Sequence, residues 1–418
     1  MGKAVKMELT EGFTAVEGGV CAAKGFTANG INCGLNAQPQ KNDLGLLFSE
    51  KECTAAAVYT QNKVKGAPIL VSRRHLAATG NQARAVIMNS KNANTCNEDG
   101  EEKAQRMCEL AAKELQIPVN QVLVASTGVI GQILPIEPIE SHIAQLVSGL
   151  CAENHGEAEE AVMTTDTVPK EIAVSFLVDG KVCRLGGMAK GSGMIKPNMA
   201  TTLNFITTDC SIAPALLQKA LDDVVKVTYN CLSVDGDTST NDMVILLSNG
   251  LAQNAQITMQ DESYAVFHQA LFLVMMNLTR MLAKDGEGAT KLLECVCQGA
   301  PDQKCAITVA KSVVGSNLLK CAIFGEDANW GRVLCAIGYA DAEFDIRSVS
   351  VDLTSAGGVL PVCRNGAGVP FSEEKAKVIL KEDEISVVVD LHQGVASARA
   401  WGCDLTYDYV KINGDYRS

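Results

Sequence analysis

The sequence has no excess of basic residues and no long apolar run. Its 418 residues include 36 Lys and Arg against 48 Asp and Glu, a net charge of −12, which argues against a basic nucleic-acid-binding protein. The most apolar run, residues 270–276, is far shorter than the roughly 20 residues that a membrane-spanning helix needs. The first residues also lack the apolar core of a signal peptide, so we expect a cytoplasmic protein.

The sixteen cysteines contain no Cys-x-x-Cys pair. The closest two, Cys295 and Cys297, lack the spacing of a zinc or redox motif, and the five histidines are scattered along the chain. We therefore expect no metal site and no bound cofactor. In a reducing compartment most of these thiols should be free and buried as small apolar side chains.

Three familiar motifs are also missing. Residues 186–193 are rich in Gly, but Lys190 precedes Gly191, whereas a Walker A phosphate loop needs Gly-Lys-Ser/Thr. The loop that starts at Asp235 fails as an EF-hand because Thr240 stands where that motif needs Gly. No Gly-x-Ser-x-Gly sequence nominates a hydrolase serine.

The composition, 47% apolar and 20% charged, is that of a folded chain with room for two or three domains. Helical spacing of apolar residues predicts three amphipathic helices, over residues 101–115, 215–226 and 261–284, the last of them capped by Asp261. Runs of β-branched residues predict strands over residues 171–178, 181–185, 203–207, 243–248, 304–310 and 386–390. These elements predict an α/β fold with layered sheets.

One segment, AKGSGMIKPNMATTLNFITTD, combines features that suit a reactive threonine. Thr201 and Thr202 directly precede a predicted strand, where most threonines are simply strand formers. Here Lys190 supplies a cation, the two glycines that follow it permit close backbone approach, and Ala200 leaves the preceding peptide uncrowded. Thr201 is therefore our candidate nucleophile.

This segment resembles the autocleavage motif of the ornithine acetyltransferases (glutamate N-acetyltransferases) of arginine biosynthesis. Other stretches resemble signatures of the same family and follow one another in the family's order. They are GGVCAAKGFTANGINCGL, VYTQNKVKGAPILVSRRHL, STGVIG, MTTDTVPK, SVDGDTSTND, DGEGATK, GEDANWGR and DYVKINGDYRS. Because they span nearly the whole chain, the chain is identified as a member of this family by resemblance.

The resemblance implies self-cleavage between Ala200 and Thr201. The products would be an α fragment, residues 1–200, and a β fragment, residues 201–418. It also implies a layered α/β sandwich similar to N-terminal-nucleophile enzymes, with the two fragments intertwined and assembled as an α2β2 heterotetramer.

Cleavage would give Thr201 a free α-amine, a base within reach of its own hydroxyl. The resemblance then implies that Thr201 takes acetyl from N-acetylornithine, releases ornithine and passes the acetyl group to glutamate. This is a double-displacement reaction.

The resemblance also assigns roles to other residues by motif. Thr127 and Gly128 resemble an oxyanion hole. Lys190 and Glu287 resemble substrate-site residues, an ammonium for a carboxylate and a carboxylate for the ornithine amine. The resemblance assigns the remaining ligand contacts to Thr164 or Thr165, to Asn413 and to Ser418.

The C-terminal contacts require a tail that docks. We expect Val410 and Ile412 to anchor it as an alternating strand.

Three alternatives remain open at the level of sequence. The self-generated threonine could serve an aminopeptidase or amidase that uses water as the acceptor. The chain could also be a non-catalytic binding protein for N-acetylated amino acids that stays uncleaved. Within the transferase reading, acetyl-CoA is a possible additional acetyl donor, which would make the enzyme bifunctional.

Overall fold

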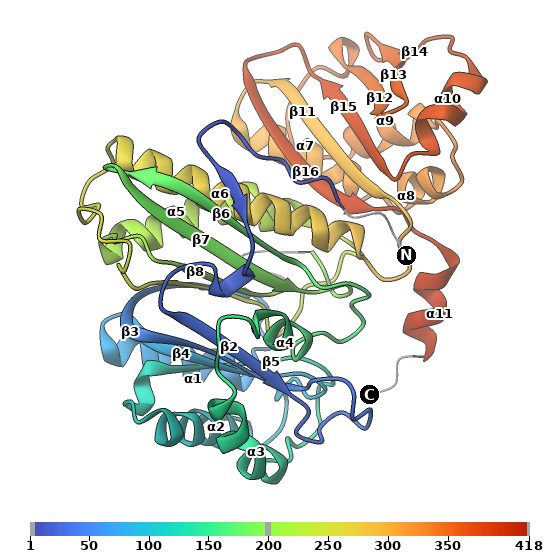
Figure 1. Ribbon diagram of the computed structural model, residues 1–418. Coiled ribbons are helices and arrows are strands. Elements are labelled where there is room, and N and C mark those ends of the chain that lie inside the picture. Colours follow the sequence, from blue (N-terminus) through green and yellow to red (C-terminus); the bar gives the residue numbers. More distant parts are fainter. Residues whose placement is uncertain (1–4, 197–201, 416–418) are drawn as a thin grey trace.

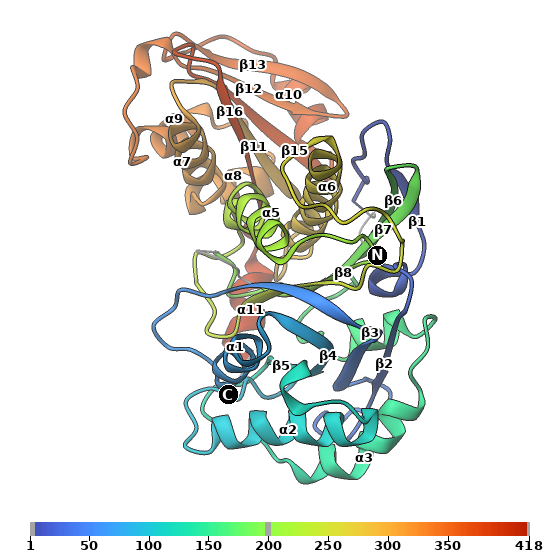
Figure 2. The same ribbon diagram turned by 90° about the vertical axis from the view of Figure 1, so that its left-hand side faces the viewer.

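The computed structural model describes residues 5–196 and 202–415. Within them the chain forms two β-sheets, with helices between the sheets and around them (Figure 1, Figure 2). The predicted layered α/β architecture is therefore confirmed.

The first sheet has nine strands in the order β1-β6-β7-β8-β10-β3-β4-β5, and β2 also pairs with β3. Its strands are β1 (Thr14–Val16), β2 (Phe26–Ile31), β3 (Leu44–Tyr59), β4 (Gln82–Asn89), β5 (Val122–Ser126), β6 (Glu171–Val178), β7 (Lys181–Lys190), β8 (Leu203–Thr208) and β10 (Met243–Ser248).

The second sheet has seven strands in the order β14-β13-β12-β15-β11-β16-β9. They are β9 (Leu232–Ser233), β11 (Leu292–Ala300), β12 (Ser350–Ser355), β13 (Gly358–Arg364), β14 (Ala367–Gly368), β15 (Glu384–Asp390) and β16 (Ala396–Cys403). The α-helices are α1 (Ala67–Thr79), α2 (Gly100–Leu115), α3 (Glu137–Ser148), α4 (His155–Glu160), α5 (Pro214–Val227), α6 (Glu262–Lys284), α7 (Gln303–Val314), α8 (Asn317–Phe324), α9 (Trp330–Gly338), α10 (Glu373–Leu380) and α11 (Tyr407–Asp415).

Strands from both sides of the Ala200–Thr201 bond alternate in the first sheet. β8 and β10 follow that bond in the sequence, and they lie between β7 and β3, which precede it. All six residues of β8 are buried. The two halves of the chain therefore share one sheet.

The three helices predicted from apolar spacing are confirmed as α2, α5 and α6. The Asp261 side chain caps α6 by accepting a hydrogen bond from the N–H of Tyr264 at 3.1 Å. α6 is apolar and long enough to cross a membrane, but 67% of its most apolar stretch is buried inside the protein. It lies between the two sheets as a core helix (Figure 1).

One predicted strand is wrong, because residues 304–310 belong to helix α7. The run is rich in β-branched residues, but its apolar positions repeat at helical spacing and Asp302 caps the helix by accepting from the N–H of Cys305 at 2.8 Å. The other predicted strands correspond to β6, β7, β8, β10 and β15. All sixteen cysteines are free and most of them are buried, as expected.

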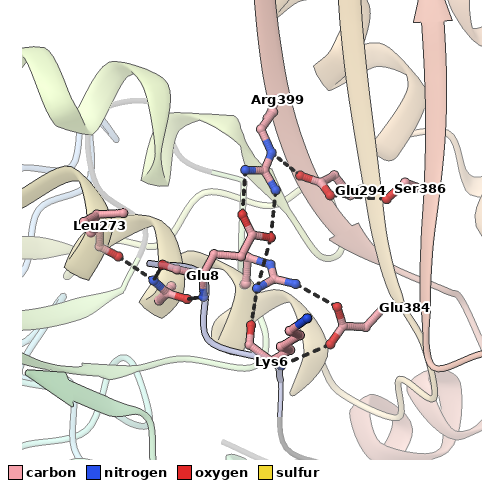
Figure 3. Close-up of polar contacts among 9 residues, drawn as sticks. Lys6, Glu8, Leu273, Glu294, Glu384, Ser386 and Arg399 are labelled. Atoms are coloured by element: carbon pink, nitrogen blue, oxygen red, sulfur yellow. Dashed lines mark hydrogen bonds and ion pairs between the residues drawn. The ribbon is translucent and has the colours of Figure 1, made fainter. Parts of the chain in front are cut away.

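An ion-pair network fastens the N-terminal segment to the second half of the chain (Figure 3). The Glu8 carboxylate accepts two hydrogen bonds from the Arg399 guanidinium, at 2.9 and 3.0 Å, and lies 3.3 Å from Arg280. Arg280 also pairs with Glu384 at 2.7 Å. Since Arg280 lies on α6 and Glu384 on β15, this segment bridges the layers of the fold.

Candidate functional site

A cavity of about 450 Å³ brings together every predicted site residue that the structure describes. These residues are Thr127, Gly128, Thr164, Thr165, Lys190, Glu287 and Asn413. They come from five separate stretches of the chain, so the fold assembles the site from segments that are distant in sequence. Its further lining residues include Ala93, Met194, Ser239, Thr240 and Asn241.

The centre of the first sheet supplies one wall of the site. β7 ends at Lys190, β8 begins at Leu203, and β10 begins at Met243. Leu203 is the register partner of Lys190 on one side and of Met243 on the other, so these three strand ends lie side by side. Thr202, the residue bonded to Thr201, enters the sheet at this point, where its carbonyl accepts from the N–H of Met243 at 3.1 Å.

Thr127 and Gly128 follow the end of β5 and line the cavity. Among the described residues, neither the Thr127 hydroxyl nor the Gly128 N–H makes a hydrogen bond within the protein. Gly128 has φ +129°, and a Cβ atom there would lie 2.3 Å from the Lys91 backbone. Only glycine fits this position without strain.

Asn241 holds these donors in place and was not recognised as a site residue from sequence. Its amide donates to the carbonyls of Ala93 at 2.6 Å and of Ser126 at 2.9 Å, directly before Thr127. Its oxygen accepts from the hydroxyls of Thr95 and Thr240 at 2.6 and 2.7 Å. Asn241 lies in the SVDGDTSTND motif, which was the available signal.

Glu287 lies on the loop after α6 and has a donor on each carboxylate oxygen. The Thr165 hydroxyl donates to Oε1 at 2.8 Å and the Asn413 amide donates to Oε2 at 2.7 Å. The carboxylate packs against Gly193, where a Cβ atom would come within 2.5 Å of it. Glu287 is therefore oriented by three different segments and still lines the cavity.

A buried ion triad lies behind these residues and was also missed. The Lys170 ammonium pairs with Asp166 at 2.8 Å and with Asp285 at 2.5 Å, all three side chains being at least 95% buried. Burial alone would raise the pKa of the Asp166 carboxyl, but the Lys170 and Lys190 cations hold it well below its usual range. The triad joins the MTTDTVPK and DGEGATK motifs.

Asp166 connects the triad to the cavity wall by hydrogen bonds to the backbone. Its carboxylate accepts from the N–H groups of Thr164 at 3.1 Å and of Gly191 at 2.8 Å. It therefore fixes the backbone directly after Lys190 and at Thr164, two segments that line the cavity.

Lys190 contributes a cation to the cavity. Within residues 5–196 and 202–415 its ammonium has no ion pair or hydrogen bond. Thr164 likewise presents a hydroxyl without a described partner, whereas the hydroxyl of Thr165 contacts Ser192 and Glu287. Thr164 is thus the freer of the two threonines between which the sequence could not decide.

The C-terminal tail reaches the site, but its predicted conformation is wrong. Residues 407–415 form helix α11 and not an alternating strand, and Val410 is 71% exposed. The tail is held by polar contacts, including the hydrogen bond from the Thr406 hydroxyl to the Gly288 carbonyl and the contact of Asn413 with Glu287. Ala200, Thr201 and Ser418 lie outside the described residues.

Comparison with known proteins identifies the family. The ArgJ family model matches residues 27–418. The arginine biosynthesis bifunctional protein ArgJ 1 of Clostridium acetobutylicum is 49% identical over 394 residues, which cover 94% of this chain and 96% of that protein.

Solved structures include two similar chains among others. One is the Bacillus halodurans arginine biosynthesis bifunctional protein, with 46% identity, 51% of this chain and 98% of that chain covered, and a TM-score of 0.48. The other is the Mycobacterium tuberculosis ornithine acetyltransferase in complex with ornithine, with 35% identity, 45% and 100% covered, and a TM-score of 0.41. Because the family model matches most of the chain and a relative is 49% identical to it, the chain belongs to the ArgJ family.

Proposed function

We propose that this protein is an acyltransferase of arginine biosynthesis that moves an acetyl group from N-acetylornithine to glutamate through an acetyl-Thr201 enzyme. The observation that carries the proposal is the cavity beside Thr202. It combines an oriented carboxylate with two hydrogen-bond donors and an ammonium that have no partner among the described residues. The family relatives named for arginine biosynthesis support it.

Each half of the reaction needs a nucleophile, a base and a stabilised oxyanion. Thr201 Oγ attacks the acetyl carbonyl of N-acetylornithine while the α-amine of Thr201 takes the hydroxyl proton. The Thr127 hydroxyl and the Gly128 N–H donate to the oxyanion of the tetrahedral intermediate. Ornithine leaves with the proton, and the amine of glutamate then attacks the acetyl ester in the reverse sense.

The charges in the cavity suit amino-acid substrates. Lys190 would bind an α-carboxylate, and Glu287 would bind the free amine of ornithine. Thr164, and at the tail Asn413 and Ser418, would supply further hydrogen bonds. Because ornithine and glutamate occupy the same cavity in turn, one set of groups serves both half-reactions.

The nucleophile would be made by self-cleavage. In this step Thr201 Oγ attacks the Ala200 carbonyl, the peptide bond shifts to an ester, and water hydrolyses the ester to leave a free Thr201 amine. The fragments, residues 1–200 and 201–418, would remain joined by their shared sheet. Two copies of each would form an α2β2 heterotetramer in the cytoplasm.

A second activity would use acetyl-CoA as the acetyl donor for glutamate. The observation that favours it is that the curated relatives are named bifunctional proteins. Assaying glutamate acetylation with acetyl-CoA and without N-acetylornithine tests it directly. A rate equal to that of the Thr201→Ala protein would limit the enzyme to recycling acetyl groups.

The main test is kinetic and chemical. Initial rates at several concentrations of both substrates should give parallel double-reciprocal lines, and incubation with N-acetylornithine alone should add one acetyl group to the peptide that starts at Thr201. Intersecting lines would indicate a ternary complex. Release of free acetate without glutamate acetylation would identify an amidase, and an uncleaved chain that binds without turnover would identify a binding protein.

A further inference from the structure

Asp242 is a buried carboxyl group with an unused oxygen next to the start of β8. The residue is 3% exposed, and its Oδ2 atom has no hydrogen-bond partner among the described residues. Buried polar atoms in folded proteins are almost always hydrogen-bonded, so an unpaired one next to a reactive site requires an explanation. None of the roles assigned above uses Asp242.

The backbone places Asp242 beside Thr202. The carbonyl of Asp242 accepts from the N–H of Thr60 at 3.0 Å, and the N–H of the next residue, Met243, donates to the Thr202 carbonyl at 3.1 Å. A small cavity of about 20 Å³ lies between them, lined by Asp242, Thr202, Lys190 and Thr127 among others. This volume holds one water molecule or one small polar group.

The groups around Asp242 determine its charge. Lys190, at the end of β7, is the charged side chain that faces it within the described parts of the chain. The loop before it contributes Ser239, and the neighbouring segment contributes the uncharged Thr202 and Leu203, the latter being the first residue of β8. Burial raises the pKa of Asp242 well above its ordinary value, although Ser239 and Lys190 act in the opposite direction.

We propose that Asp242 is a positioning residue that stays a neutral carboxylic acid beside the oxyanion donor Thr127, and that its deprotonation switches acetyl transfer off at alkaline pH. This rests on the proposed function. A neutral carboxylic acid offers a hydrogen-bond donor and no charge. A carboxylate in the same place would oppose the oxyanion that Thr127 and Gly128 stabilise, and it would compete for the Lys190 cation.

The test compares the pH dependence of kcat in the wild-type protein and in Asp242→Asn. With both substrates saturating, wild-type kcat should fall on the alkaline side of its pH profile, because burial displaces the ionisation of a carboxyl group to higher pH. Asp242→Asn cannot ionise, so at the alkaline end of this fall its kcat should exceed that of the wild type by at least about fivefold. An alkaline fall that persists in Asp242→Asn, or a wild type with no alkaline fall, would overturn the proposal.

Glu159→Gln is the matched control, because Glu159 is the other buried carboxyl with a raised pKa and an unpaired oxygen. It does not line the small cavity, so this variant should keep the alkaline fall.

Infrared spectroscopy of Glu159→Gln at pH 7 gives a readout that is independent of acetyl transfer and of whether Asp242→Asn folds. A protonated-carboxyl band at that pH supports a neutral Asp242, and its absence contradicts it. If no protein transfers acetyl at any pH while the band is present, the proposed function has failed and not the protonation of Asp242.

Discussion

The proposed role of Thr127 and Gly128 rests on a hydroxyl and an N–H group that make no hydrogen bond to any residue the structure describes. Their side-chain and backbone donors face the cavity, while Asn241 fixes the chain immediately before them. Donors held in this way need no reorganisation when charge develops on the substrate, which is the main source of oxyanion stabilisation. The conformation of Gly128 is part of the same arrangement.

Thr127→Ala should lower kcat by about a hundredfold to a thousandfold, since loss of one oxyanion donor typically costs that much. Thr127→Ser keeps the hydroxyl and should recover part of the rate. The measurement is kcat and KM for both substrates. A change confined to KM would assign Thr127 to substrate binding instead.

Thr201→Ala should abolish both self-cleavage and acetyl transfer, because it removes the proposed nucleophile. Thr201→Ser should retain some of each. Mass spectrometry under denaturing conditions checks cleavage: the wild type should give two fragments of similar size, and Thr201→Ala should give one chain of 44.2 kDa.

Thr202→Val is the control for the neighbouring hydroxyl, which accepts a hydrogen bond from Asn204. This variant should still be cleaved at the same bond. Cleavage that depends on Thr202 and survives in Thr201→Ala would transfer the nucleophile role to Thr202.

At the scale of single elements, α11 acts as a support for Glu287. Its Asn413 amide holds one carboxylate oxygen while Thr165 holds the other, so the C-terminal helix completes the orientation of the proposed substrate-binding group. The helix has no buried residues, and it therefore depends on polar contacts to stay in place.

Asn413→Ala should raise KM for N-acetylornithine by roughly tenfold to a hundredfold, since a lost hydrogen bond to a charged group costs about 1.5–3 kcal/mol. Deleting residues 414–418 should have a similar effect through Ser418 and leave self-cleavage intact. Steady-state kinetics checks both variants. Val410→Ala, on an exposed position of the same helix, is the control, and unchanged kinetics in the deletion protein would show that the tail makes no substrate contact.

α4 carries a buried carboxyl that makes stability depend on pH. Burial raises the pKa of Glu159 to about 8, although the N–H of Lys170 hydrogen-bonds its Oε1 atom. Because the folded-state pKa lies above the unfolded value, the contribution of Glu159 to stability is complete below about pH 4.5 and is lost as the pH rises towards 8.

Glu159→Gln should therefore raise the free energy of unfolding at about pH 8 by about 1–3 kcal/mol and change it little at about pH 4.5. Urea unfolding at the two pH values measures the difference. An equal effect at both would show that Glu159 acts through packing and not through its charge.

At the scale of the whole molecule, the N-terminal segment connects the layers through Glu8 (Figure 3). Glu8→Ala would leave the guanidinium groups of Arg280 and Arg399 without the carboxylate that lies between them. We expect a loss of about 1–3 kcal/mol in unfolding free energy, and less in high salt because Glu8 is 37% exposed. Thermal unfolding at low and high salt measures both effects, and a loss that does not depend on salt would assign Glu8 a packing role.

The sequence predicts the layered fold, the long helices and the residues that line the cavity. Local patterns explain the helices, since α2, α5 and α6 have apolar faces that can be read directly. The site residues came from resemblance, because nothing local brings Thr127 near Glu287. Asn241, the Lys170 triad and Asp242 escaped because their roles depend on tertiary contacts, and residues 304–310 and α11 were misread because strand and helix signals overlap in short segments.

The central position of β8 in the first sheet determines whether chain cleavage can precede folding. If the bond before Thr201 is cut, the new N-terminus is followed closely by β8. This strand pairs with β7, which is encoded before the cut, and with β10, which is encoded after it. Neither half could complete this sheet alone, so a cut at this bond would have to come after folding. A gene divided at this point would produce two polypeptides that depend on each other from synthesis onward, whereas the intact gene delivers both in equal number and already assembled.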